Sequence, residues 1–381
     1  MIKSKFLKRN QAAEKPKYWL RLTRLCNNNC VFCLDKENRK GTIVKFSEIK
    51  AEVKKARKQG SDKLILSGGE PTLHPDYLEI IRFARQAGFR EIQTVTNGRM
   101  FAYRNFLKKA LENGLTETTF SFHGHTRELY EKQSGIKGSY EQAFTGLTNV
   151  LNSKGLIVNI DIVINKINYR YLDKVIKFFL RLGIREFDLL QVVPFGSAWD
   201  NRDKVFYNLE KALPFIKKAF SLQHQYPDIY LWTNRLPAQY LEGFEELIQH
   251  PVKLYDEIRG RKKILERFID RKVLMRCYDK QCPYCYIENF CKDLIELRRA
   301  KRLAAREPAV CLRKGSVHPP KVFLAAKRID LEKFLDFYIE HRYFLKSLRC
   351  RNCRDDGRCE GAPINLIRKK GFRILSPSRK K

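Results

Sequence analysis

The sequence predicts an α/β fold in which helices cover a parallel sheet, followed by a basic helical region and a small cysteine-rich module. Strand-like and helix-like segments alternate through the first half of the chain. A glycine follows each expected helix, and the alternation ends near Pro194-Phe195-Gly196. Six strand–helix units in a row favour a parallel sheet, because a helix is the usual crossover between parallel strands.

Each expected strand is a short run rich in β-branched, aliphatic and aromatic residues. The runs are Tyr18–Thr23, Lys63–Ser67, Glu91–Thr96, Thr116–Phe122, Ile157–Ile164 and Glu186–Val193. Apolar residues recur at helical spacing in Glu48–Gln59, Tyr77–Ala87, Asn105–Glu112, Tyr140–Ser153 and Tyr171–Leu182. The glycines that follow them are Gly60, Gly88, Gly114, Gly155 and Gly183, as expected just after a helix C-terminus.

Composition limits the class of protein. The 381 residues are 43% hydrophobic and include 11 cysteines, with 76 Lys and Arg against 42 Asp and Glu, a net charge of +34. This composition excludes wholesale disorder, and no apolar run approaches the roughly 20 residues of a membrane span. Residues 1–17 are basic but lack the apolar stretch of a signal peptide, so we expect a cytoplasmic protein. Cysteines in a cytoplasmic protein indicate metal or redox chemistry rather than disulfides.

The first cysteine cluster, Cys26, Cys30 and Cys33, directly follows the first expected strand. Three thiolates on one short loop can bind three irons of a cubane cluster and leave the fourth iron open. A zinc-binding loop is the alternative. Polar residues also follow the next strands, in Ser67-Gly68-Gly69-Glu70-Pro71-Thr72, Thr96-Asn97-Gly98 and Ser121-Phe122-His123. Parallel sheets place their reactive groups at this end of the strands, where the two glycines would let the backbone approach a ligand closely.

The CX3CX2C loop with its aromatic Phe32, followed by GGEP, resembles the radical S-adenosylmethionine (SAM) superfamily over roughly Tyr18–Gly196. The resemblance implies a partial (β/α)6 TIM-like barrel at 18–205. It implies a [4Fe-4S] cluster on Cys26, Cys30 and Cys33, with SAM chelating the open iron. An external reductant of the flavodoxin or ferredoxin type would supply one electron, and a 5′-deoxyadenosyl radical would then abstract hydrogen from a substrate.

The resemblance also assigns roles to other residues. Phe32 would pack beside the adenine, and the segment from Ile162 to Asn168 would lie near it. Backbone atoms of the Gly68-Gly69-Glu70-Pro71 motif would receive the SAM amino group. Asn97 and Ser121 would contact the SAM carboxylate or ribose. Val193-Pro-Phe-Gly resembles the end of the family's barrel.

The remaining cysteines contain a repeated CX2CX5C spacing. One triplet is Cys282, Cys285 and Cys291, and the other is Cys350, Cys353 and Cys359. With Cys277 and Cys311 upstream, the eight thiols divide into two sets of four, which suit two auxiliary [4Fe-4S] clusters or structural zinc. Our hypothesis pairs Cys277 with the first triplet and Cys311 with the second. It would be wrong if Cys277 belonged to the second set and Cys311 to the first.

The last segment, CRNCRDDGRCEG with Gly371 and Pro377, resembles the auxiliary-cluster extension called SPASM, although no cysteine stands near Pro363. The expected organisation is a basic extension at 1–17, the barrel at 18–205, a basic helical region at 206–276 and the SPASM-like module at 277–381.

Several other features favour ordinary structural roles. We expect His123 and His125 at a polar barrel rim rather than as acid–base groups, and His74 in a turn. Tyr278, Tyr284 and Tyr286, beside the cysteines, are expected to pack rather than to relay a radical.

Three functional hypotheses follow. A radical SAM enzyme that modifies a peptide or protein is favoured by the SPASM-like extension. An RNA-modifying radical SAM enzyme is favoured by the basic stretches Lys253–Lys272 and Arg298–Arg306, which include the aromatic residues Tyr255 and Phe268. A non-catalytic iron–sulfur or zinc protein that binds nucleic acid is the third, and the intact GGEP motif argues against it. The charge also fits an anionic small molecule.

Overall fold

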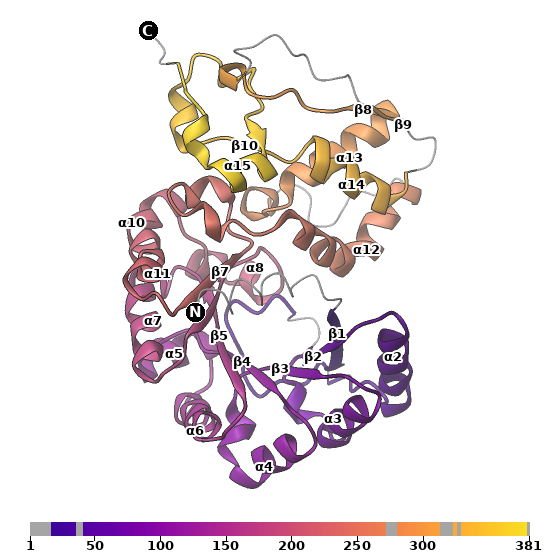
Figure 1. The fold of residues 1–381 in the computed structure, drawn as a ribbon, viewed down its shortest axis with the longest axis vertical. Coiled ribbons are helices and arrows are strands. Elements are labelled where there is room, and N and C mark those ends of the chain that lie inside the picture. The colour runs from indigo at the N-terminus through magenta and orange to yellow at the C-terminus, as the bar shows by residue number, and fades with distance from the viewer. Residues whose placement is uncertain (1–16, 36–40, 272–279, 313–322, 326–328, 379–381) are drawn as a thin grey trace. The chain divides into compact units, whose positions relative to one another are not determined.

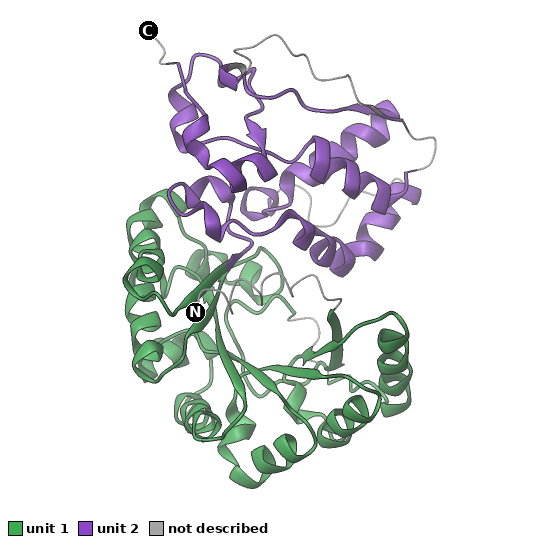
Figure 2. Cartoon of the chain, viewed as in Figure 1, with its two compact units in different colours: residues 1–232 green, residues 233–381 purple. Residues whose placement is uncertain are grey.

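The computed structural model describes residues 17–35, 41–271, 280–312, 323–325 and 329–378 (Figure 1). The chain divides into two compact units, residues 1–232 and 233–381 (Figure 2). Apart from Lys17, the expected basic extension lies outside the described residues. The boundaries expected at 205 and 276 stay predictions.

The first unit is built on one seven-stranded sheet whose strands follow each other in chain order. The strands are β1 (Lys17–Thr23), β2 (Lys63–Gly68), β3 (Glu91–Thr96), β4 (Glu117–Ser121), β5 (Ile157–Ile164), β6 (Glu186–Gln191) and β7 (Tyr230–Asn234). Strands β1 to β6 pair in parallel, each with the next. The fold is therefore α/β with a partial barrel, as the sequence predicted.

Helices lie along the outer face of this sheet (Figure 1). They are α2 (Phe46–Lys58), α3 (Tyr77–Gln86), α4 (Arg104–Glu112), α5 (Arg127–Ser134), α6 (Ser139–Leu151), α7 (Leu172–Arg181), α10 (Leu209–Phe220) and the short α11 (Leu222–Gln225). The short helices α8 (Ser197–Asp200) and α9 (Arg202–Val205) follow β6 and pack against the loop after β1. The glycines expected after five of these helices all have positive φ, from 81° to 109°. The C-terminal ends of these five helices were thus predicted to within two residues.

The two faces of the strands differ because side chains alternate along a strand. On β5, Ile160, Ile162 and Ile164 are completely buried, whereas Asp161 and Val163 between them are partly exposed. The face of the sheet opposite the buried isoleucines is the inner face of the partial barrel. At the start of the strands, a polar network connects residues on this inner face. Glu117 accepts hydrogen bonds from Lys63 Nζ at 2.6 Å and from Asn159 Nδ2 at 3.0 Å. The opposite ends of the strands carry the loops of the candidate site.

Two elements of the first unit differ from the expectation. Strand β7 lies within the region expected to be helical, because its five residues are too short a run to stand out between helices. Helix α5 was not expected, since its eight residues are mostly polar. Its local signal is Thr126, whose side chain accepts a hydrogen bond from the backbone N–H of Leu129 at 3.2 Å and caps the helix.

The second unit has its own core and, among its described residues, several helices and short strands. They are α12 (Leu254–Arg271), α13 (Glu288–Ala300), α14 (Leu331–His341), α15 (Ile364–Lys370), β8 (Arg302–Ala304), β9 (Phe323–Ala325), β10 (Phe344–Leu345) and β11 (Ala362–Pro363). The ring of Phe290 lies 4.9 Å from that of Phe334 and 5.2 Å from that of Tyr338, measured between centroids. Buried Asp293 accepts two hydrogen bonds from Arg342 at 2.8 Å and a third from Arg306 at 3.1 Å.

Among the described residues, no helix is long and apolar enough to cross a bilayer.

Candidate active site

The cluster loop, residues 26–33, directly follows β1 and carries the first three cysteines. Cys26 is exposed, Cys30 and Cys33 are partly buried, and none of the three forms a disulfide. The backbone N–H of Asn28 donates to Cys26 Sγ at 3.4 Å, and that of Cys33 donates to Cys30 O at 3.1 Å. This donor set fits an iron–sulfur cluster, because three thiols on one compact turn are its usual ligands.

Helix α5 holds the middle of the cluster loop. The backbone N–H groups of Asn29 and Val31 donate to Ser134 O at 2.8 Å and to Gln133 O at 3.0 Å. Gly135 follows the helix with a φ of 69°, and a Cβ there would lie 2.5 Å from Asn29 O. The loop therefore rests on the carbonyl end of α5, and only glycine fits at the contact.

The segment after β3 holds the beginning of the cluster loop. Asn97 Nδ2 donates to Asn27 Oδ1 at 2.6 Å, and Asn97 Oδ1 accepts from the backbone N–H of Arg99 at 3.1 Å. The Arg99 guanidinium donates to the backbone oxygen of Asn27 and to Asn28 Oδ1, the latter at 3.0 Å. Asn97 was expected to face SAM, and its amide contacts the loop that carries the thiols. The SAM contact stays a prediction.

The segment after β6 holds the end of the loop. Ser197 N donates to Cys33 O at 2.7 Å, and Asn201 Nδ2 donates to Val31 O at 3.1 Å. Phe32 packs in an apolar cluster with Val192, Ala198, Val205 and Phe206 and is only 8% exposed. The expected contact between Phe32 and adenine stays a prediction.

The glycines of GGEP permit a close approach of two backbone segments. Gly69 N donates to Thr23 O at 2.8 Å, and Glu70 N donates to Leu25 O at 2.6 Å. A Cβ on Gly69 would lie 2.1 Å from Leu25 O, and one on Gly68 would lie 2.3 Å from Thr23 O. The close approach expected toward a ligand is thus made toward the chain just before the cluster loop. These contacts use the backbone N–H groups of Gly69 and Glu70. The ammonium group of SAM would instead need backbone carbonyl oxygens of the motif.

The Glu70 carboxylate connects the segments after β2 and β3. It is 1% exposed. Oε1 accepts from the Thr72 and Thr96 hydroxyls at 2.6 and 2.7 Å and from Thr72 N at 3.2 Å, while Oε2 accepts from Asn97 N at 2.7 Å. Burial raises the pKa of Glu70, and the four hydrogen bonds lower it. Pro71 begins the short 3-10 turn Pro71–Leu73 beside it.

Strands β4, β5 and β6 bring further predicted residues to the site. Ser121, the last residue of β4, pairs in register with Asp161, and Asp161 pairs with Asp188 on β6. Both aspartates lie on the inner face at the level of Ser121, and the sequence analysis missed them. The signal was the alternation in IVNIDIVI, where polar residues stand between buried isoleucines.

The two residues expected near the adenine are fully buried. The Ile162 side chain packs in the core behind the sheet. Asn168 Nδ2 donates to His123 O at 3.1 Å and to Val163 O at 2.9 Å, and its Oδ1 accepts from Asn165 N at 2.9 Å. Asn168 thus fixes the backbone after β4 and β5. Its contact with a cofactor stays a prediction.

The histidines have distinct surroundings. His123 is 5% exposed, and its Nδ1 accepts from Val163 N at 3.1 Å, which leaves the proton on Nε2. Burial lowers the pKa of His123 to about 3, so the ring is neutral at physiological pH. Burial and the nearby Lys174 and Arg181 lower the pKa of His125. His74 Nδ1 accepts from Asp76 N at 3.0 Å, in the turn where the sequence placed it.

In the second unit, three cysteines affect the pKa of a fourth, Cys350. Burial raises the pKa of the Cys350 thiol, and the charges of Cys359, Cys353 and Cys311 raise it further. In the other set, Arg261 Nη1 donates to Cys285 Sγ at 3.7 Å, and Cys285 and Cys291 contact the apolar core. Cys282 begins the turn Cys282–Tyr284, and Cys277 and Tyr278 lie outside the described residues. Within the described ranges, no three Cys, His, Asp or Glu side chains converge as the ligands of a single metal ion would.

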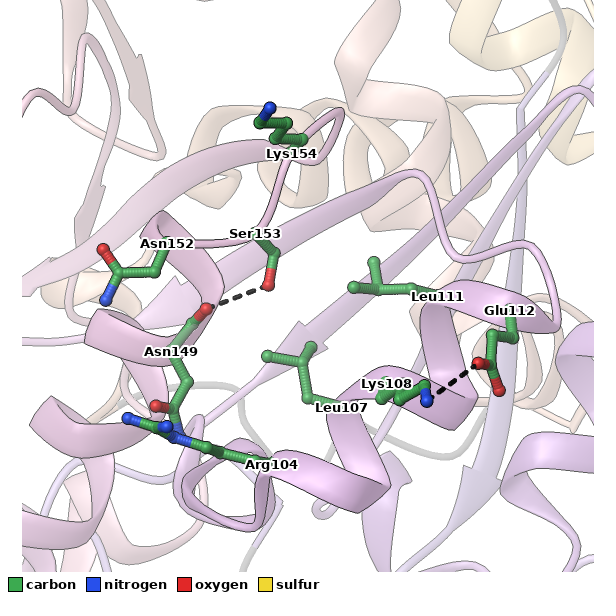
Figure 3. Close-up of a pocket in the computed structure, with 9 residues that line it drawn as sticks. All are labelled: Arg104, Leu107, Lys108, Leu111, Glu112, Asn149, Asn152, Ser153 and Lys154. Atoms are coloured by element: carbon green, nitrogen blue, oxygen red, sulfur yellow. Dashed lines mark hydrogen bonds and ion pairs between the residues drawn. The ribbon is translucent and has the colours of Figure 1, made fainter.

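A separate surface hollow of about 520 Å³ lies between α4 and α6 (Figure 3). Its lining is Arg104, Leu107, Lys108, Leu111, Glu112, Asn149, Asn152, Ser153 and Lys154. It lies in the outer helical layer and contains no cysteine. We therefore assign the chemistry to the cluster loop.

Residues 20–179 match the family described as the radical SAM superfamily. Among curated proteins, the chain is similar to the "Probable GTP 3',8-cyclase" of Saccharolobus islandicus (strain M.14.25 / Kamchatka #1), with 30% identity over 176 residues. The match covers 46% of this chain and 56% of that protein. The corresponding protein of Sulfurisphaera tokodaii is 28% identical over 46% of this chain and 55% of its own length. The chain thus spans little more than half the length of these relatives.

Among solved structures, the chain is similar to Streptococcus suis SuiB bound to S-adenosylmethionine. The TM-score is 0.47 at 16% identity, covering 94% of this chain and 76% of SuiB. Native anSMEcpe with bound AdoMet and the Kp18Cys peptide gives a TM-score of 0.46 at 18% identity, covering 57% and 64%.

Proposed function

We propose that this chain is a radical SAM enzyme whose first site is the cluster loop. The observation that supports it best is the anchoring of a loop with three cysteines by four chain segments, beside a buried Glu70 network. When bound, the [4Fe-4S] cluster and SAM supply one-electron cleavage of the sulfonium and a 5′-deoxyadenosyl radical.

The chain's own residues bind, orient and shield. Cys26, Cys30 and Cys33 would hold three irons and leave one for SAM. Backbone oxygens of Gly68 and Gly69 would accept hydrogen bonds from the SAM amino group. Phe32 packs in its apolar cluster beside Cys33 and would shield this side of the loop from water. Radical chemistry needs this exclusion because solvent would quench a reactive intermediate.

The test measures 5′-deoxyadenosine from SAM under anaerobic reduction. Replacing Cys26, Cys30 and Cys33 with Ala should abolish the product. Cys311→Ala is the matched control, because it removes a thiol from the other unit and should leave cleavage of SAM measurable. Product from the triple variant at the wild-type rate would refute the assignment.

We further propose two auxiliary [4Fe-4S] clusters in the second unit, on Cys277, Cys282, Cys285 and Cys291 and on Cys311, Cys350, Cys353 and Cys359. The effect of Cys311 on the Cys350 thiol supports the second set. Three clusters predict about 12 Fe per chain, whereas one cluster with structural zinc predicts about 4 Fe and about 2 Zn. Zinc in the purified protein at that ratio would contradict the auxiliary clusters.

The proposed substrate is a peptide or protein, as the SPASM-like spacing indicates. A guanine nucleotide is the second candidate, because the similar cyclases are named for GTP. RNA is the third, favoured by the net charge of +34. Each class can be added to the reduced enzyme with SAM, and deuterium from a labelled substrate should appear in 5′-deoxyadenosine only for the correct one. Label transferred from GTP and not from peptide would refute the peptide proposal.

An external one-electron donor is also part of the proposal. A flavodoxin or ferredoxin of acidic surface suits this chain, because opposite net charges accelerate encounter. Association should weaken as salt is raised.

A further inference from the structure

Tyr130 carries a buried hydroxyl group and is not one of the residues proposed to bind the cluster or SAM. It lies in α5 and is 1% exposed. Among the described residues, its hydroxyl oxygen has no hydrogen-bond partner. A buried hydroxyl that makes no hydrogen bond costs roughly 1–3 kcal/mol, so an unpaired one indicates a missing partner.

The position of Tyr130 on α5 brings it to the cluster loop. Gln133 and Ser134, whose carbonyl oxygens bind Val31 and Asn29, follow it by three and four residues. The cluster loop is therefore bonded to backbone oxygens that lie one helical turn beyond Tyr130.

The charges that act on the Tyr130 hydroxyl come from the site. Burial raises the pKa of Tyr130, the charge of Cys30 raises it next, and a smaller rise comes from Glu70. The Asn28 side chain and Arg99 lower it. Asn28 Oδ1 already accepts from Arg99, and it makes no hydrogen bond of normal geometry with Tyr130. Cys30 is the one proposed cluster ligand among these groups.

Aromatic contacts fix the ring. Its centroid lies 4.5 Å from that of Phe122 and 5.9 Å from that of Tyr140. Because the ring is held on these sides, the hydroxyl cannot turn outward to solvent.

We propose that the Tyr130 hydroxyl donates a hydrogen bond to the cluster at its Cys30 corner and makes the cluster easier to reduce. This inference rests on the proposed [4Fe-4S] site. Reduction adds negative charge to the cluster sulfurs, so a donor stabilises the reduced form more than the oxidised form. Tyr130 is thus a positioning and tuning residue for the electron-accepting step.

The test compares wild type with Tyr130→Phe and with the matched control Tyr140→Phe. Tyr140 is partly exposed and belongs to the same aromatic group. Each full-length protein is reconstituted with iron and sulfide and poised at a series of fixed potentials. The reduced first cluster is counted by electron paramagnetic resonance, as the signal that SAM alters and that the Cys26, Cys30 and Cys33 triple variant lacks.

We expect the reduced-to-oxidised ratio at a fixed potential to fall about tenfold in Tyr130→Phe, the effect of one charge-assisted hydrogen bond, and to change less than twofold in Tyr140→Phe. In D2O, electron–nuclear double resonance of the wild type should show an exchangeable deuteron near the cluster, and Tyr130→Phe should lack it.

Three outcomes overturn the inference. They are an unchanged ratio in Tyr130→Phe, an equal change in both tyrosine variants, and a Tyr130→Phe protein that cannot hold the first cluster while Tyr140→Phe can. The last result would assign Tyr130 to building the loop. A wild-type protein with no SAM-sensitive cluster would overturn the proposed function as well, and is distinguished by its iron content.

Discussion

Replacing Glu70 with Gln tests whether this carboxylate stabilises the candidate site. Four donors point at it, three at Oε1 and one, Asn97 N, at Oε2. In Glu70→Gln the amide oxygen can keep the three hydrogen bonds now made to Oε1. The new NH2 group then faces the Asn97 N–H, and two donors cannot bond to each other. One hydrogen bond to a charged acceptor is lost, about 1.5–3 kcal/mol, and the other three weaken because their acceptor becomes neutral.

Relief of the buried charge offsets part of that loss, since burial disfavours the charged form. We expect a net loss of roughly 3 kcal/mol in the free energy of unfolding. For a unit of about 230 residues this lowers Tm by roughly 6–12 °C. Scanning calorimetry of the full chain measures the shift, and faster amide hydrogen exchange in 23–33 and 96–99 would locate it.

The control is Glu79→Gln on α3, where an exposed carboxylate pairs with Arg82 and the expected loss is below about 1 kcal/mol. A Glu70→Gln protein that melts within about 2 °C of wild type would refute the reasoning, because four donors to a buried carboxylate should not be replaceable at so little cost.

Three further predictions concern stability, each measured by urea unfolding. His123 has a pKa of about 3 when folded and an ordinary pKa of 6.5 when unfolded, so the unfolded chain binds a proton first as pH falls. Stability should therefore drop by roughly 1.4 kcal/mol per pH unit from about pH 6 to about pH 4 through this residue, and His123→Gln should make the dependence shallower by that amount. In Gly69→Ala the new Cβ would meet Leu25 O, so we expect the free energy of unfolding to fall by roughly 3 kcal/mol. The control is Gly260→Ala in α12, which has open space around it and should raise the free energy of unfolding by about 0.5–1 kcal/mol. Equal effects of the two substitutions would contradict the close approach of Gly69 to Leu25. Asp293→Asn removes the buried carboxylate that pairs with Arg342 and Arg306, and should lower the free energy of unfolding by about 3–5 kcal/mol. The control is Glu340→Gln, at an exposed carboxylate, where we expect a loss below about 1 kcal/mol. A small loss in Asp293→Asn would mean that the two arginines find other partners.

Local patterns predicted most of the first unit's fold. The strand Ile157–Ile164 was predicted with both ends correct, because its apolar residues alternate with polar ones and Gly155 precedes it. Strand β7 was missed because pairing with a neighbouring strand defines it, and five residues carry little pattern of their own. Helix α5 was missed because its buried residues are few, so it depends on its cap and on packing.

The site was predictable as a set of motifs but not as a set of contacts. Spacing identified Cys26 and its neighbours, and GGEP identified Glu70. The partners of these residues come from distant parts of the chain, as when Asn97 contacts Asn27 and Ser197 contacts Cys33. No local pattern encodes such pairs, since they exist only once the strands are aligned.

The anchoring of the cluster loop has a consequence for how the protein matures. In small zinc domains, metal binding supplies the energy that folds the chain. In this chain, hydrogen bonds from α5, from Asn97 and Arg99, from Ser197 and Asn201 and from the GGEP backbone hold the thiols on one turn. The polypeptide thus provides a preformed acceptor, so synthesis of the chain and delivery of iron can be separate events. Of the three cysteines, Cys26 is the one most accessible from solvent, whereas Cys30 and Cys33 are partly buried.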